Sequence, residues 1–229
     1  MPKITLNKKD TLKLIGKAIS DKQLSGAIPL IGTDLEKITK NEIEVEIFPN
    51  RPDMLSEEGF ARALSSFLGI KTGLKAYKVN KSNYKYKVDS KVKRIRPYCT
   101  AAIVKGLKFD KVSLAAIMNL QDKLHTTHGR NRKKVAMGVH DLSKIKFPLT
   151  YTTKPKSFKF RALEDKQEKT IQKILEEHPK GKDYAHLLNK SEVPIWMDAN
   201  NQVLSMPPII NSEETKVTLN TKEVFLDIT

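Results

Sequence analysis

The sequence predicts an α+β fold with two domains, and three observations carry that prediction. In the run 42–48, acidic residues at 42, 44 and 46 alternate strictly with apolar residues at 43, 45 and 47, which is typical of a half-buried strand. Residues 112–124 place apolar side chains at helical spacing. Apolar runs rich in β-branched residues recur at 135–142, 203–211 and 224–229, and these favour strands in the second half. A length of 229 residues suffices for one large or two modest domains.

A small α/β domain is predicted for residues 1–82. It begins with a short strand at Ile4–Leu6 and a helix from about Asp10. The alternating strand at 42–48 follows, after a loop marked by glycine and proline. Asp53 is then expected to cap a second helix, which Gly69 ends.

The charge of the chain points to nucleic acid. Lys and Arg number 42 against 26 Asp and Glu, which gives a net charge of +16. Such an excess makes nucleic acid a natural partner, although a lysine-rich composition gives the same figure without RNA. Cys99 is the only cysteine, so a disulfide within the chain and a cysteine-based metal site are excluded. No apolar run approaches the roughly 20 residues of a membrane span, and a cytoplasmic location without membrane partners is expected.

A basic linker is predicted at residues 83–96, within a longer basic stretch that has interleaved tyrosines. Two interpretations remain open for the stretch. It is either a solvated connection between two domains or a strip that follows a phosphate backbone.

Residues 97–229 form the predicted second domain, which contains a basic loop. Its cations are Arg130, Arg132, Lys133 and Lys134, and they are predicted to contact RNA; a plain exposed loop is the alternative. The nearby pair His125 and His128 has no third ligand at suitable spacing, so no metal site is predicted.

His140 and Asp141 end an apolar run, and they allow two interpretations. Asp141 orients His140 as a general base, or Asp141 caps the turn that follows while His140 is a satisfied core residue. Neighbouring residues on a strand point to opposite faces, so the pair need not be in contact.

A pocket wall is the sharper interpretation of residues 203–211, and an edge strand with a turn is the plainer one. Two consecutive prolines stiffen this run and prevent it from continuing a ladder. Asp227 and Thr229 are two apart on a strand, so they share a face; the alternative is that they end a solvent-facing strand. The candidate pocket residues are apolar walls at Trp196 and Leu204, small polar groups at Ser205 and Asn211, and the pair Asp227 and Thr229.

Several collinear motifs resemble one family. They are Asn50-Arg-Pro-Asp53, Gly138-Val-His-Asp-Leu142, His178-Pro-Lys-Gly-Lys-Asp-Tyr-Ala-His-Leu-Leu188, Val193-Pro-Ile-Trp-Met-Asp198, and the run Val203–Asn211 with Val224–Thr229. Together they resemble the amino-terminal part of the phenylalanyl-tRNA synthetase beta subunit of the archaeal and eukaryotic type. The resemblance implies a B1-type domain at 1–82 and a B3/B4-type editing domain at 97–229 that is incomplete at Thr229.

The resemblance also implies a chemistry. An editing domain hydrolyses mischarged Tyr-tRNA(Phe), and it selects tyrosine by its phenolic hydroxyl. By this resemblance Ser205, Asp227 and Thr229 are the catalytic residues, and Trp196, Leu204, Asn211 and His140 contact the substrate. The expected partners are tRNA(Phe) and an alpha subunit, in an assembly of two alpha and two beta subunits. No cofactor is expected in this chain, since ATP and magnesium serve the whole synthetase. The alternative is a non-catalytic module for tRNA binding or assembly.

Overall fold

The computed structural model describes residues 2–229, and they fold as two compact units. One unit contains the chain up to Asn80 together with Met118–His128, and the other contains Lys81–Ile117 and Gly129–Thr229. Strands and helices occur in both units, which confirms the predicted α+β class. Within residues 2–229, no helix combines the length and the apolar character needed to cross a membrane.

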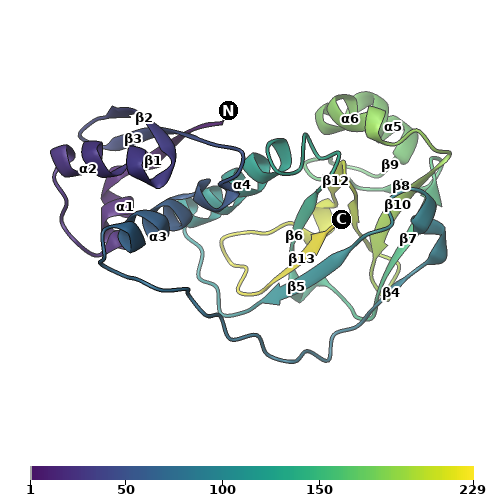
Figure 1. Cartoon of the computed structure of the whole chain (residues 1–229). Helices are drawn as coiled ribbons and strands as arrows, with labels where there is room; N and C mark the ends of the chain where they lie inside the picture. The colour runs from purple at the N-terminus through teal and green to yellow at the C-terminus, as the bar shows by residue number, and fades with distance from the viewer. Residues whose placement is uncertain (1) are drawn as a thin grey trace. The chain divides into compact units, whose positions relative to one another are not determined.

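The first unit is built on a three-stranded antiparallel sheet in the order β1-β3-β2 (Figure 1). Its central strand is the one that the alternating acids predict, and every apolar residue of that strand is buried. Ile4 faces Val45 and Leu6 faces Ile43 across the β1–β3 ladder, so one face of the sheet is apolar. That face packs against the helices in the first hydrophobic core. The elements are β1 (Lys3–Asn7), α1 (Lys8–Ile15), α2 (Asp21–Ala27), β2 (Thr33–Ile38), β3 (Glu42–Ile47) and α3 (Glu57–Phe67).

The helices of this unit begin at residues other than those predicted. Asn7 caps α1 with its side chain, and Ser56 caps α3 by accepting a hydrogen bond from the amide of Gly59. Asp53 instead lies in a short 3-10 turn and pairs with Arg51 at 2.9 Å. Helix α2 was not predicted at all; a capping box at Ser20 starts it.

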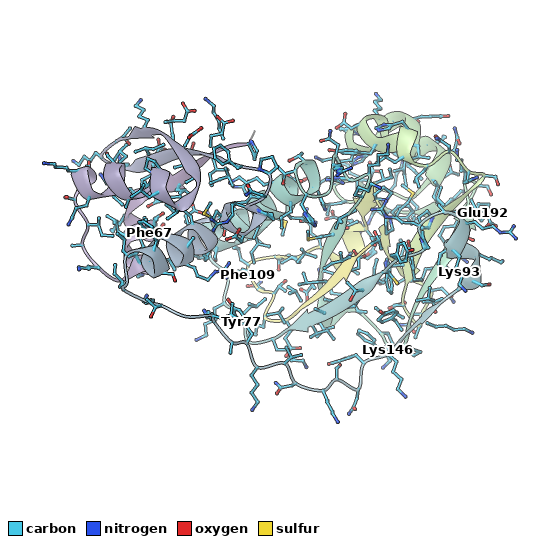
Figure 2. All side chains as sticks on the ribbon, viewed as in Figure 1. Phe67, Tyr77, Lys93, Phe109, Lys146 and Glu192 are labelled. Carbon is cyan, nitrogen blue, oxygen red and sulfur yellow. The ribbon has the colours of Figure 1, made fainter. Side chains whose placement is uncertain are left out.

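The basic stretch does not behave as a single linker. Between α3 and β4 the chain runs without helix or strand (Figure 1). Phe67 at the end of α3 and Tyr77 within this stretch are 50% and 64% exposed (Figure 2). Residues 86–94 differ from the prediction of a linker, since β4 (Tyr86–Val88) joins a sheet of the second unit and Val92 is fully buried in a core.

The second unit contains two larger sheets and one two-stranded ladder. The five-stranded sheet has the order β12-β11-β10-β7-β4, and the three-stranded sheet has the order β5-β13-β6 (Figure 1). The strands of the second unit are β4, β5 (Thr100–Val104), β6 (Met137–Asp141), β7 (Leu149–Pro155), β8 (Lys159–Phe160), β9 (Lys169–Thr170), β10 (Glu192–Met197), β11 (Val203–Met206), β12 (Ile210–Asn211) and β13 (Val224–Ile228).

Each face of the five-stranded sheet has its own core. One core joins Trp196 and Leu204 of this sheet to Phe225 of the three-stranded sheet. The other joins the opposite face of β10 to helix α5, through Ile195 and Ile174. The second unit therefore has three layers, in the order small sheet, large sheet and helices.

Helices α5 (Ile171–Glu177) and α6 (Pro179–Tyr184) lie in the second unit, and α4 (Lys111–Thr126) is divided between the two units. The last turns of α4 belong to the first unit, where Leu120 and Leu124 pack against its core. His178 follows the end of α5 and caps the start of α6, where its Nδ1 accepts a hydrogen bond from the amide of Lys180.

Candidate functional site

Asp227 is the centre of a buried polar cluster between the two larger sheets of the second unit. Its Oδ2 accepts a 2.6 Å hydrogen bond from the hydroxyl of Ser205, which lies on β11 of the other sheet. Its Oδ1 accepts a 2.7 Å bond from the backbone amide of Gly138 on the neighbouring strand β6. Asp227 and Ser205 are each only 2% exposed. The interpretation of Asp227 as the end of a solvent-facing strand is therefore wrong.

The environment of Asp227 favours the carboxylate anion. Burial raises the pKa of this carboxyl, because water no longer solvates the charge. The hydrogen bond and charge of His140, together with the bonds from Ser205 and the Gly138 amide, lower the pKa by more than burial raises it. The net result is a pKa below the ordinary value of 3.8, so Asp227 is ionised at neutral pH.

His140 links this cluster to a second hydroxyl. Its Nε2 lies 3.4 Å from Oδ2 of Asp227, and its Nδ1 lies 2.8 Å from the hydroxyl oxygen of Thr215. The Thr215 hydroxyl also donates to the carbonyl oxygen of Leu204 at 3.5 Å. The imidazole therefore stands between the hydroxyl of Thr215 and the carboxylate of Asp227.

Asp141 has a different role from His140. Its Oδ1 accepts hydrogen bonds from the amide and the hydroxyl of Ser143, and its Oδ2 accepts from the hydroxyl of Thr221. Of the two sequence interpretations, the structure bears out the one in which Asp141 caps the following turn. The carboxylate that faces His140 is Asp227.

Gly138 is required at its position by close packing. A Cβ atom there would lie 2.5 Å from Nε2 of His140 and 2.6 Å from Oδ1 of Asp227. Cβ atoms essentially never approach so closely. The absence of a side chain allows the Gly138 amide to donate directly to the carboxylate.

The run with two prolines forms a hairpin. Strands β11 and β12 pair so that Ser205 stands directly opposite Asn211, although the sequence placed them at opposite ends of one rigid segment. Strand β12 is the edge of the sheet, as expected of a run that cannot continue a ladder. The side-chain amide of Asn211 donates to the carbonyl oxygen of Val139 at 3.4 Å.

Trp196 and Leu204 are fully buried beside the cluster. The indole stacks on Tyr151 with ring centroids 4.8 Å apart, and its edge contacts include Phe225 at 6.0 Å. The register between β10 and β11 shifts after Trp196, and Leu204 packs in the same core as the indole. Among residues 2–229 the indole Nε1–H has no hydrogen-bond partner. The two side chains form an apolar wall, and their contact with substrate stays a prediction.

Thr229 is held by Arg96. The guanidinium donates from Nε to the Thr229 hydroxyl at 3.0 Å and from Nη2 to its carbonyl oxygen at 2.8 Å. Thr229 is 7% exposed. Arg96 falls within the predicted basic linker, and its half-buried position could not be inferred from the surrounding lysines. Three partners of this cluster were therefore not predicted from the sequence: Gly138, Thr215 and Arg96.

The four cations predicted to bind RNA do not act alike. Arg130, Lys133 and Lys134 are exposed, and their contact with RNA stays a prediction. Arg132 is buried, and its Nη1 donates to the carbonyl oxygens of Ile209 at 2.7 Å and Pro208 at 3.3 Å. A guanidinium bound in this way is not free to bind a phosphate, so the prediction for Arg132 is corrected.

No group of three or more His, Cys, Asp and Glu side chains suited to a metal ion occurs within residues 2–229. The cluster around Asp227 instead combines one carboxylate, one imidazole, two hydroxyls and a backbone amide. Such a set can bind a hydroxyl or an ammonium group and can orient a water molecule.

Comparison with known proteins agrees with this architecture. Residues 81–229 match the family model described as the B3/4 domain. The phenylalanine–tRNA ligase beta subunit of Archaeoglobus fulgidus is 45% identical over 230 residues, and that of Methanocaldococcus jannaschii is 42% identical over 234 residues. Both alignments cover the whole of this chain but only 42% of the relative.

A solved structure extends the agreement to three dimensions. An amino-terminal fragment of the phenylalanyl-tRNA synthetase beta subunit from Pyrococcus horikoshii superimposes with a TM-score of 0.93 at 42% identity. The match covers 99% of this chain and 67% of the fragment. The chain therefore belongs to the B3/4 domain family and is a relative of the amino-terminal region of phenylalanine–tRNA ligase beta subunits.

Proposed function

We propose that this chain edits mischarged tRNA by hydrolysing the ester bond between tyrosine and tRNA(Phe). The observation that carries the proposal is the ionised, buried Asp227 with Ser205 at 2.6 Å, next to the aromatic wall of Trp196. Tyrosine differs from phenylalanine only by a phenolic hydroxyl. A carboxylate in an apolar setting rewards a ligand that donates a hydrogen bond and penalises one that leaves the site unpaired.

The chemistry requires few groups. An ester already carries a good leaving group, so a positioned water molecule and donors to the developing oxyanion suffice. In this proposal Asp227 accepts a hydrogen bond from the tyrosyl hydroxyl or ammonium group, and Ser205 and His140 hold the carboxylate and orient water. Because Asp227 and Ser205 are almost fully covered, the covering side chains move when substrate enters.

The proposal extends to the whole protein. The relatives are beta subunits of phenylalanine–tRNA ligase, and this chain spans 42% of the length of the Archaeoglobus fulgidus subunit. We place it in such a cytoplasmic ligase, with an alpha subunit that attaches phenylalanine to tRNA(Phe) at the expense of ATP. On this view the assembly has two alpha and two beta subunits.

A second candidate is a non-catalytic module that binds tRNA or supports assembly. It is favoured by the burial of Trp196 and of the Ser205–Asp227 pair, which leaves the cluster covered. In both candidates the basic residues bind tRNA, but only the editing domain hydrolyses the ester bond.

A deacylation assay separates them. The 229-residue chain is incubated with Tyr-tRNA(Phe) and, separately, with Phe-tRNA(Phe), and the free amino acid is measured. Editing predicts rapid release of tyrosine and slow release of phenylalanine. Binding of both tRNAs without release above the spontaneous rate would support the module instead.

A further inference from the structure

Residues 130–132 form a left-handed turn that ordinary side chains rarely adopt. Arg130, Asn131 and Arg132 have φ values of 48°, 53° and 63°. The turn is closed by a 2.9 Å hydrogen bond from the amide of Lys134 to the carbonyl oxygen of Gly129. Three consecutive residues persist in this region only where the surroundings over-determine them. The contacts of Arg132 hold the turn in this conformation.

The Arg132 side chain is directed into the second unit while its neighbours on the turn are exposed. Its guanidinium donates to the carbonyl oxygens of Pro208 and Ile209, in the connection between β11 and β12. The same group lies over the ring of Tyr184, 4.5 Å from its centroid. Arg132 therefore contacts the connection of the hairpin that carries Ser205 and Asn211.

The backbone of Arg132 is tied to the other side of the cluster. Its carbonyl oxygen accepts a 3.2 Å hydrogen bond from Nη2 of Arg96, and that same nitrogen donates to the carbonyl oxygen of Thr229. One turn is thus connected to the strand that carries Asp227 and, through the guanidinium, to the hairpin that carries Ser205.

We propose that Arg132 is a positioning residue that holds the β11–β12 hairpin against the end of β13, and so sets the geometry between Ser205 and Asp227. This inference rests on the proposed editing function for its kinetic consequence only. The exposed cations on the same turn contact RNA in that account, whereas Arg132 acts through protein contacts alone.

The test compares Arg132→Lys with Arg62→Lys, because Arg62 is an exposed arginine of the first unit, whereas the cluster lies in the second. Both keep the charge and remove the planar fork, but only Arg132 uses its fork on the β11–β12 hairpin. In deacylation of Tyr-tRNA(Phe), Arg132→Lys should lower kcat about tenfold or more while KM and the salt dependence stay at the parent's values. Arg62→Lys should leave kcat unchanged. A raised KM or an altered salt dependence in Arg132→Lys, with kcat unchanged, would identify it as a phosphate ligand and overturn the proposal.

Hydrogen exchange without substrate tests the same contact independently of activity. Arg132→Lys should speed exchange of the Ile209 and Ala136 amides, which bond to Met206 and Thr229, and leave strand β7 at the parent's rate. Uniformly faster exchange across the second unit would mean general destabilisation, and unchanged exchange would mean no positioning role; either result overturns the proposal. If the parent chain fails to deacylate Tyr-tRNA(Phe), the proposed function fails while this measurement still decides the role of Arg132.

Discussion

The hydroxyl of Ser205 donates a 2.6 Å hydrogen bond to the carboxylate of Asp227 across two different sheets. The bond joins strand β11 to strand β13, and both residues are buried. A hydroxyl that bonds an anion in an apolar setting contributes more than an exposed one, because water cannot replace it. This contact is where the fold of the second unit and its proposed chemistry meet.

Ser205→Ala should slow hydrolysis of Tyr-tRNA(Phe) by up to about tenfold, because the variant removes one neutral donor to Asp227. Ser143→Ala is the matched control, since Ser143 makes a 2.6 Å bond to the carboxylate of Asp141 outside the cluster. Single-turnover deacylation rates compare the two variants. Equal effects of both changes would show that the Ser205 contact has no special role.

The stability of the second unit should depend on pH through Asp227. Because the pKa of Asp227 is lowered in the folded chain, its contribution is complete above the ordinary value of 3.8 and is lost as the pH falls below it. Asp227→Asn removes this titration and should cost about 1.5–3 kcal/mol of unfolding free energy at pH 7. The difference between parent and variant should shrink from pH 5 to pH 3.

Urea unfolding measures this difference. Trp196 is the only tryptophan and is fully buried in the second unit, so its fluorescence reports that unit. A difference that stays constant between pH 7 and pH 3 would contradict a lowered pKa.

Gly138→Ala should destabilise the second unit by about 1–3 kcal/mol or more, because its Cβ would overlap with His140 and Asp227. Gly26→Ala is the matched control: Gly26 lies within α2, and an added Cβ would meet nothing within 4 Å. That change should stabilise the first unit by about 0.4–1 kcal/mol. Calorimetry of both variants checks the pair, and a neutral Gly138→Ala would contradict the close packing.

The exposed cations of the basic loop should contribute to tRNA affinity by neutralising phosphates. Replacing Arg130, Lys133 and Lys134 together by alanine should reduce the slope of log affinity against log salt by about 0.7–0.9 for each phosphate that is no longer neutralised. Filter binding of tRNA(Phe) between 50 and 200 mM salt, roughly the range over which such interactions weaken, measures that slope. An unchanged slope would exclude this loop as a phosphate-binding surface.

Local patterns were sufficient to predict several elements. Strand β3 followed from strict alternation, and α4 followed from helical spacing, because each signal lies within one segment. Strands β7 and β10 were not predicted. Three threonines interrupt the apolar pattern of β7, and Pro194 stands in the middle of β10. The two strands pair with each other along six residue pairs, and their faces are buried in the two cores of the unit. No local signal contains either relationship.

The candidate site likewise has features that local sequence predicts and features that it does not. Period two places Asp227 and Thr229 on one face of a strand, and both are buried. The partner of His140 depends instead on register: Phe225 stands opposite His140, so Asp227, two residues further on, lies diagonally within reach. The Arg132 side chain points into the protein, unlike those of Arg130 and Lys133, because the backbone forms a left-handed turn there. A run of arginines and lysines does not predict such a turn.

The role of the buried carboxylate in editing can be measured by comparing hydrolysis of Tyr-tRNA(Phe) by the parent chain and by Asp227→Asn. The substitution keeps the shape of the side chain and removes its charge. We expect the rate to fall about ten- to a hundredfold, while tRNA affinity and the structure around Trp196 remain those of the parent. If the Asp227→Asn chain released tyrosine at the parent's rate, Asp227 would have no part in hydrolysis.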